Sequence, residues 1–175
     1  MARKFLLRVL ETERLVLRRF SNDDAEFILQ LLNEPSFVRN IGDKGVRTIA
    51  DAFQYIRTGP VASYERFGFG PYLVQLKETG DSIGLCGLIK REQLDDVDVG
   101  FAFLPSFWSM GFAFEAASAV LDYGRDVLGI SRILAIALPE NSSSIKLLEK
   151  LGLRFERMIR LSDDEPALKL FGPGA

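Results

Sequence analysis

The sequence predicts a mixed α/β fold in which one sheet carries helices on both faces. Short segments that alternate apolar and polar residues recur along the chain, as expected for strands. Between them lie segments whose apolar residues repeat every three or four positions, as expected for helices. The 175 residues are 47% hydrophobic and contain no linker, repeat or low-complexity tract, so we expect a single domain over residues 1–175. The predicted order of elements is βααβββαβαββ.

The N-terminal half is expected to contribute two helices and three strands. Ser21 can cap the first helix, which ends before Pro35. The second helix begins at Thr48 and stops at Gly59-Pro60, because proline lacks a main-chain N–H and clashes with the preceding turn. The strands are predicted over residues 15–20, 72–77 and 83–90.

The C-terminal half is expected to alternate strands with two further helices. Residues 96–103 alternate with a period of two until Pro105 stops the strand. After Gly111 the period changes to that of a long helix, for which Gly129 is a plausible C-cap. The almost wholly apolar run of residues 132–138 is typical of a strand covered on both faces. A helix over residues 142–151, for which Asn141 is a natural N-cap, and strands over 153–161 and 167–171 complete the chain.

Composition narrows the classes of function. The 22 Lys and Arg nearly balance the 24 Asp and Glu, for a net charge of -2, which gives no bulk reason to expect a nucleic acid or an anionic membrane as partner. The apolar runs are too short to span a bilayer, and the N-terminus lacks the apolar core of a signal peptide, so we expect a cytoplasmic protein. Histidine is absent and Cys86 is the single cysteine. Neither a metal site nor an internal disulfide is therefore expected.

Residues 96–114 organise the predicted fold, because they lead from a strand through a short turn into the start of the long helix. The first amides of a helix have no partner within it, and the helix dipole leaves partial positive charge there. Gly111 has no side chain to block a close approach, so this turn suits a diphosphate. Alternatively, Gly111 serves only to let the chain turn from strand to helix.

Five segments of the chain match the pattern of one family in the right order. They are residues 10–20 (LETERLVLRRF), 83–88 (IGLCGL), 98–104 (DVGFAFL), 108–116 (WSMGFAFEA) and 141–153 (NSSSIKLLEKLGL). Through them the chain resembles the GNAT superfamily of acetyl-CoA-dependent N-acyltransferases. The closest resemblance is to the RimJ/RimL-like branch, which includes N-terminal acetyltransferases of ribosomal proteins. The last two motifs are together the most specific part of the match.

The resemblance implies a mostly antiparallel sheet of about seven strands, with about four helices on its faces, that parts in the middle to hold coenzyme A. It also implies acetyl-CoA as co-substrate and an amine as acceptor. Homodimers are common in the family, so a homodimer is expected by analogy.

The coenzyme A site of the family maps onto three stretches of this chain. The implied binding residues are Phe101, Ala102 and Phe103 for the pantetheine, the amides of Ser109, Met110, Gly111, Phe112, Ala113 and Phe114 for the diphosphate, Asn141 and Ser144 near the thioester, and Lys146 for a phosphate. The sequence departs from the family at Ser109 and Met110, where glycine and then a basic residue are usual. This loss removes one charge-assisted contact, worth roughly 1.5–3 kcal/mol, but leaves the main-chain amides in place.

The implied reaction is direct transfer of the acetyl group to a neutral amine. It needs a proton acceptor, donors for the oxyanion and a proton for the leaving sulfur. Asp98 is the first candidate base, acting through water, because it takes the acidic position of the family; Glu92 and Glu140 are alternatives. A main-chain amide of residues 101–103 would meet the oxyanion, and Ser144 would donate a proton to the thiolate. 

Two functions remain open at this point. The preferred one is an N-acetyltransferase acting on a peptide N-terminus or a small amine, which acidic residues such as Asp95, Asp96 and residues 163–165 would attract. The alternative is a GNAT-fold protein that binds acyl-CoA without useful catalysis, which the departures at Ser109 and Met110 motivate. A covalent route through Cys86 has no base near it in the sequence.

Overall fold

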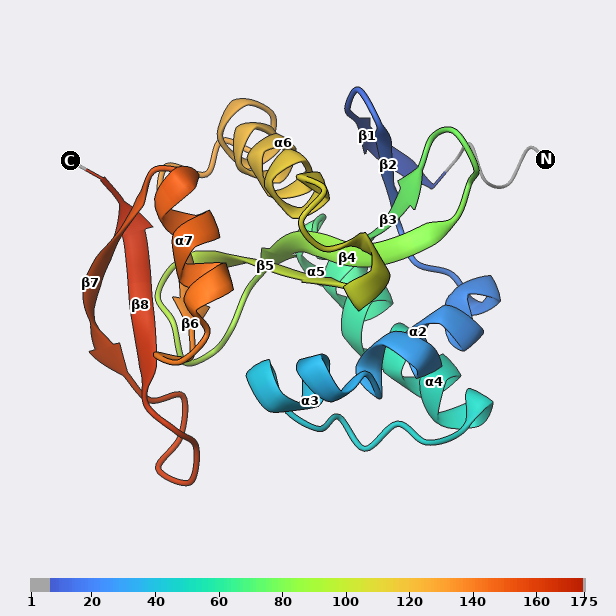
Figure 1. The fold of residues 1–175 in the computed structure, drawn as a ribbon, viewed down its shortest axis with the longest axis horizontal. Coiled ribbons are helices and arrows are strands. Elements are labelled where there is room, and N and C mark those ends of the chain that lie inside the picture. The colour runs from blue at the N-terminus through green and yellow to red at the C-terminus, as the bar shows by residue number, and fades with distance from the viewer. Residues whose placement is uncertain (1–6, 175) are drawn as a thin grey trace.

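A computed structural model describes residues 7–174 of the chain. Its strands form one sheet in the order β1-β2-β3-β4-β5-β6-β8-β7 (Figure 1). The strands are β1 (Arg8–Glu11), β2 (Leu15–Arg18), β3 (Pro71–Leu76), β4 (Ser82–Ile89), β5 (Val97–Phe103), β6 (Ile133–Ala137), β7 (Leu153–Ile159) and β8 (Leu168–Pro173). Neighbouring strands are antiparallel except β5 and β6, which are parallel. The predicted mixed, mostly antiparallel sheet is therefore confirmed.

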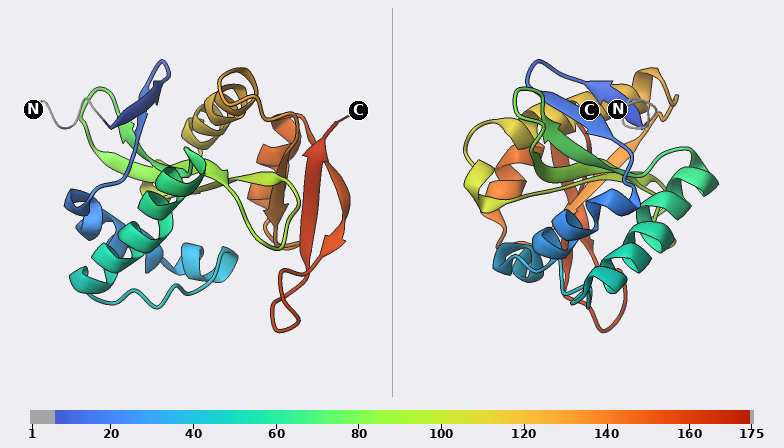
Figure 2. Two further views of the ribbon diagram at one scale, coloured as in Figure 1. Left: turned by 180° about the vertical axis from the view of Figure 1, so that it is seen from behind. Right: turned by 90° about the vertical axis from the view of Figure 1, so that its right-hand side faces the viewer.

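Helices cover both faces of this sheet, as predicted (Figure 2). They are α2 (Ala25–Leu32), α3 (Pro35–Asn40), α4 (Ile49–Ile56), α5 (Ala62–Phe67), α6 (Phe112–Asp126) and α7 (Ser142–Lys150). On one face, Val120 of α6 and Leu148 of α7 are fully buried in the larger core cluster. On the other face, Ile28 of α2 and Ile56 of α4 pack with Leu73 of β3 in a second cluster. Helices therefore cover both faces of the central strands, which explains why these strands are long apolar runs.

The second helix does not stop at Gly59-Pro60, so that prediction is wrong. The chain continues from α4 through a π turn, Arg57–Val61, directly into α5. In this wider turn the Ala62 N–H reaches back to the Arg57 carbonyl, and Pro60 lies buried within it. The longer hydrogen-bonding step makes room for a proline that an α-helical turn would reject. The spacing of Phe53 with Ala52 and Ile56 predicts that it faces the core, but its side chain is 41% exposed.

Two elements have no counterpart in the sequence analysis. The short strand β1 pairs with β2 and extends the sheet beyond the expected seven strands or so. It begins at Arg8 and ends at Glu11, and both side chains are exposed. With a charged residue at each end, the segment lacks the alternation of apolar and polar residues that predicts a strand. Helix α3 begins at Pro35, which stands in its first turn, where proline is favoured because that N–H would have no partner in any case. Pro35 therefore ends one helix and starts another.

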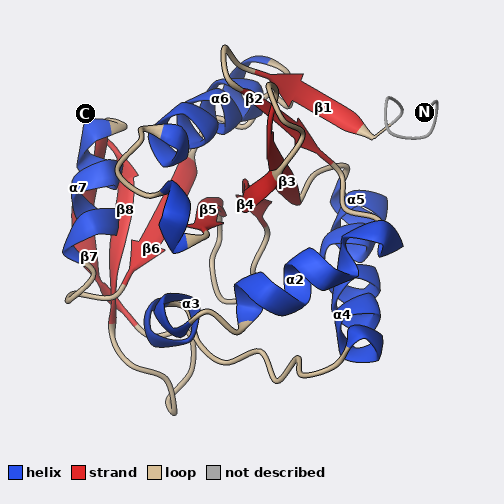
Figure 3. Ribbon diagram, turned by 45° about the vertical axis from the view of Figure 1, so that its right-hand side comes forward, coloured by secondary structure: helices blue, strands red, loops and turns tan. Residues whose placement is uncertain are grey.

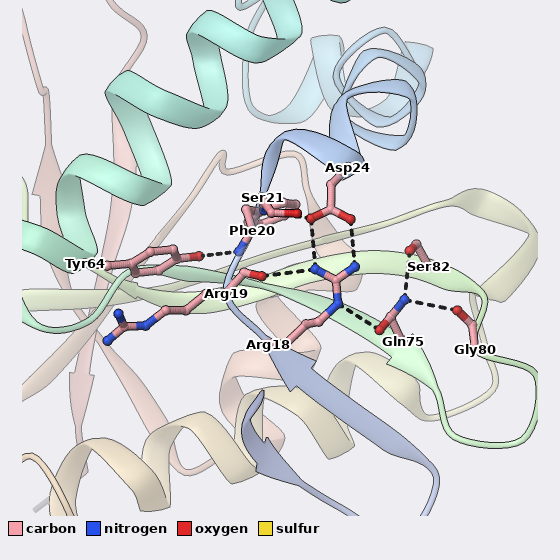
Figure 4. A network of polar contacts seen from close by, with 9 residues as sticks. All are labelled: Arg18, Arg19, Phe20, Ser21, Asp24, Tyr64, Gln75, Gly80 and Ser82. Carbon is pink, nitrogen blue, oxygen red and sulfur yellow. Dashed lines mark hydrogen bonds and ion pairs between the residues drawn. The ribbon is translucent and has the colours of Figure 1, made fainter. Parts of the chain in front are cut away.

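A buried ion pair fastens the first helix to the sheet (Figure 4). The guanidinium of Arg18, at the end of β2, donates to both carboxylate oxygens of Asp24 at 2.9 and 2.7 Å. Asp24 also accepts the Ser21 N–H at 2.8 Å, as expected from a capping box, and Arg18 donates to Gln75 of β3 at 3.0 Å. Arg18 and Asp24 are both only 5% exposed, so the ion pair is buried and links β2, β3 and the start of α2.

The sheet parts between β5 and β6, as the resemblance implied (Figure 3). In the described part of the chain these strands pair only through Val97↔Ile133 and Asp98↔Leu134. On its other side β5 pairs with β4 along its whole length, from Ile89↔Asp98 to Gly84↔Phe103. The end of β5 therefore has a neighbour on one edge and a gap on the other.

Candidate functional site

The gap beside β5 presents main-chain groups of two phenylalanines. The Leu104 N–H donates to the Ile83 carbonyl in β4 at 2.9 Å. Main-chain groups of alternate residues point to the same side of a strand, so those of Phe101 and Phe103 point away from β4, toward the gap. The Phe103 carbonyl accepts the Trp108 indole N–H at 2.9 Å. The Phe101 amide and the Phe103 amide are thereby aimed at the space between the strands, whereas Ala102 faces β4.

Helix α6 begins next to this gap at Gly111. Gly111 has a φ of 82°, in the left-handed region, and among the described residues no side chain caps this helix start. Ser109 also has a positive φ, of 60°, which is uncommon outside glycine. The chain thus turns sharply twice before the helix begins. Ser109, Met110 and Gly111 are exposed, so the main chain of this turn is open to a ligand, as an anion-binding helix start requires.

The residues predicted on the last helix lie at the start of α7. Asn141 caps that helix, as predicted, because its side-chain oxygen accepts the Ser144 N–H at 3.2 Å. Ser144 is half-buried and Lys146 is exposed. Both α6 and α7 lie on the same face of the sheet, on either side of the gap (Figure 1). The structure therefore brings the three predicted stretches around the part of β5 that is not paired with β6.

Asp98 lies at the closed end of the gap, in the last residue pair that joins β5 to β6. It is 1% exposed, and its Oδ1 accepts the Arg91 Nε–H at 2.8 Å. Its Oδ2 has no hydrogen-bond partner among residues 7–174. Burial raises the pKa of the Asp98 carboxyl, while Arg91 and Lys90 act to lower it. A buried carboxylate oxygen without a hydrogen-bond partner is able to accept a proton.

The other candidates for catalysis are placed less favourably. Glu92 and Glu140 are both exposed. Cys86 is completely buried in the main core cluster, and burial raises the pKa of its thiol far above neutral pH, so this thiol stays protonated and is a poor nucleophile. Of the acidic residues expected to attract an amine, Asp96 is paired with Arg132 at 3.2 Å. Arg132 also pairs with Glu156 at 2.6 Å, so Asp96 shares its cation with a second carboxylate.

The fold brings to the start of α6 residues that the sequence motifs did not identify as part of the site. Glu115, in the first turn of α6, accepts hydrogen bonds from Arg14 Nε at 2.7 Å and from the Thr12 hydroxyl at 2.5 Å. Arg14 and Thr12 lie in the turn between β1 and β2. These residues lie in two of the matched motifs, residues 10–20 and 108–116. Neither motif indicates that the two segments are in contact. Arg91 was also missed as the partner of Asp98.

Over residues 7–174, no cluster of three or more Cys, Asp or Glu side chains is arranged to hold a metal ion. No helix in this part of the chain has the length and hydropathy of a membrane span.

The sequence model of the Acetyltransferase (GNAT) domain family matches residues 14–154. The uncharacterized N-acetyltransferase YoaA of Bacillus subtilis is 32% identical over 153 residues, which are 87% of this chain and 86% of YoaA. A GNAT-family acetyltransferase structure from Bacillus anthracis is 25% identical and has a TM-score of 0.77, covering 93% of this chain and 96% of that one. The ribosomal L7/L12 alpha-N-protein acetyltransferase RimL, solved with coenzyme A, shares the fold with a TM-score of 0.80 at 14% identity, covering 94% and 96%. The chain therefore belongs to the GNAT acetyltransferase family, and its activity is acetyl transfer from acetyl-CoA.

Proposed function

We propose that this acetyltransferase acts on a primary amine, either a peptide N-terminus or a small molecule, in the manner of the RimJ/RimL-like branch. The observation that carries the proposal is the position of Asp98. It lies buried at the closed end of the gap between β5 and β6, with Oδ2 unpartnered among the described residues. An ammonium group must lose a proton before its nitrogen can attack, and this oxygen can accept one directly or through water.

Acetyl-CoA would bind beside the unpaired part of β5, mainly through main-chain groups. The diphosphate would lie on the amides of residues 109–114, where the left-handed conformation of Gly111 leaves the turn uncovered. The pantetheine would run beside residues 101–103, whose free edge can pair with an amide-bearing chain. Asn141, Ser144 and Lys146 would line the side formed by α7.

The proposed chemistry is a balanced acyl transfer. The amine nitrogen attacks the thioester carbonyl carbon, a C–N bond forms, and the carbonyl oxygen becomes an oxyanion. The N–H of Phe101 or Phe103 would stabilise that oxyanion, since both amides face the gap. The C–S bond then breaks. The oxyanion returns to a carbonyl as the thiolate leaves. Asp98 takes the proton of the amine, Ser144 would donate one to the leaving thiolate, and the proton on Asp98 would return to Ser144 through water, which restores both groups.

The demand on Asp98 is modest if the acceptor is a peptide N-terminus. An α-amino group has an unperturbed pKa of about 7.7–8.0, so a fair fraction is already neutral near pH 7. A side-chain amine such as that of lysine, with a pKa of about 10.4, would need more help from the base. We therefore place peptide N-termini first among the proposed acceptors.

The test is an acceptor panel assayed by release of free thiol from acetyl-CoA. It contains short peptides with different N-terminal residues, the same peptides with blocked N-termini, polyamines, and hydroxyl compounds. Transfer to free but not to blocked N-termini supports the proposal. Transfer only to hydroxyl acceptors would show that the amine class is wrong. A rise in unfolding temperature with coenzyme A but no turnover with any acceptor would favour a binding protein without useful catalysis.

A further inference from the structure

The turn between β1 and β2 is fastened to the start of α6 by one arginine. Arg14 Nε donates to Glu115 Oε2 at 2.7 Å, and the Arg14 main-chain N–H donates to Glu115 Oε1 at 2.9 Å. The Thr12 hydroxyl donates to the same Oε1 at 2.5 Å. Glu115 is thus held by three donors, although the turn and the helix are far apart in the sequence.

Glu115 creates an electrostatic conflict at this helix start. It stands in the first turn of α6, where the helix dipole favours a single anion. Burial acts to raise the pKa of its carboxyl, but the hydrogen bonds from Thr12 and Arg14 outweigh burial and the pKa is lowered, so Glu115 is charged at neutral pH. A diphosphate that binds the same turn meets this negative charge unless a cation cancels it.

Arg14 also grips the turn itself. Its Nη1 donates to the Met110 carbonyl at 2.9 Å, its guanidinium carbon lies 4.3 Å from the centre of the Phe112 ring, and a Cβ on Gly111 would come within 3.3 Å of its Nη2. The C=O and N–H of a trans peptide unit point in opposite directions. Holding the Met110 carbonyl toward Arg14 therefore turns the Gly111 N–H away from it. Within the described residues that N–H forms no hydrogen bond.

We propose that Arg14 is the positioning residue of the coenzyme A diphosphate site. It cancels the charge of Glu115 and orients the 110–111 peptide so that the Gly111 N–H is presented to the phosphates. This inference rests on the proposed binding of the diphosphate at residues 109–114. By this inference the β1–β2 turn contributes to the affinity for coenzyme A. No side chain of the turn after β5 makes that contribution.

The test is a double-mutant cycle at Arg14 and Glu115, with the variants Arg14→Gln, Glu115→Gln and the double substitution. The dissociation constant of coenzyme A is measured by calorimetry, and kcat and KM are measured with acetyl-CoA and with S-acetylpantetheine, which lacks the diphosphate. Arg14→Gln is expected to raise the dissociation constant and the KM for acetyl-CoA roughly fivefold to tenfold, with little change for S-acetylpantetheine. The double variant is expected to recover most of the lost affinity for coenzyme A, because it also removes the negative charge of Glu115.

The controls separate this inference from a structural effect and from the proposed function. Arg125→Gln changes an exposed arginine at the other end of α6, paired with Asp122 at 3.8 Å, and is expected to bind coenzyme A like the wild type. If Arg14→Gln does not fold, Glu115→Gln alone still decides, since it should bind coenzyme A at least as tightly as the wild type. Equal losses with both thioesters, a double variant as weak as Arg14→Gln, or weaker binding by a stable Glu115→Gln would overturn the role of Arg14. Wild-type protein that binds no coenzyme A would instead overturn the proposed site.

Discussion

Asp98 is a buried residue and the proposed general base. Asparagine at this position has nearly the same shape and can still accept the Arg91 Nε–H, but it cannot take up a proton. Asp98→Asn is therefore expected to lower kcat by about 10²- to 10⁴-fold, the usual contribution of a general base, with little change in KM for acetyl-CoA. Steady-state kinetics with the best acceptor of the panel measures this. A variant that keeps wild-type kcat would move the role of base to another group.

The pH dependence follows from the same side chain. Burial raises the pKa of Asp98, and only the carboxylate can act as base, so kcat/KM is expected to fall as the pH drops through a value above the ordinary range of aspartate. Arg91 and Lys90 oppose that rise. Arg91→Gln removes the closer charge and should shift the acidic limb of the profile to higher pH, whereas Arg91→Lys should leave it nearly in place. An unshifted limb in Arg91→Gln would mean that Asp98 does not set it.

Arg18 and Asp24 form the residue pair that matters most for stability. Arg18→Met leaves the Asp24 carboxylate buried without its cation, and removing one partner of a buried pair costs about 3–5 kcal/mol. Chemical denaturation of the variant should show a loss of that size. The matched control is Arg47→Met, because Arg47 and Asp43 form an ion pair whose side chains are half-exposed, so a much smaller loss of stability is expected. Equal losses in the two variants would contradict the importance of burial.

At the scale of elements, the start of α6 and its end offer a matched comparison. Gly111 has a φ of 82° and Gly129 a φ of 68°, and an alanine in this region costs roughly 1–2 kcal/mol. Both Gly111→Ala and Gly129→Ala should therefore destabilise the fold by similar amounts in thermal unfolding. Only Gly111→Ala should also raise the KM for acetyl-CoA, since its new methyl group would crowd Arg14 and cover the turn. A raised KM in both variants would point to a global effect.

Elements could be predicted where their signals are local. The period change at Gly111 and the cap at Asn141 depend on neighbours a few residues away, and both predictions agree with the structure. The helix end expected at Pro60 is absent because the chain continues through a π turn, whose longer hydrogen-bonding step accommodates the proline. The strand β1 was missed because its own side chains carry no strand pattern; only pairing with β2 defines it.

For the whole molecule, the family resemblance could predict the parted sheet and the stretches around it, but not the contacts that cross the fold. The ion pair of Arg14 with Glu115 joins residues about a hundred positions apart, and no periodicity reports a contact of that kind. The pairing of Arg91 with Asp98 is nearer in sequence but depends on how the turn before β5 folds back. The contacts missing from the sequence analysis are therefore those that set charge at the site.

The two halves of the sheet are joined by just two residue pairs in the part of the chain that the structure describes, Val97↔Ile133 and Asp98↔Leu134. Beyond them, each half ends in an unfinished ladder edge. A pantetheine arm between these edges would form hydrogen bonds with them in place of a neighbouring strand, so the bound substrate would connect the two halves of the sheet. Coenzyme A should accordingly slow amide hydrogen exchange at Phe101 and Phe103 far more than at residues of β2. The catalyst would be stiffest when loaded and would loosen each time its product departs.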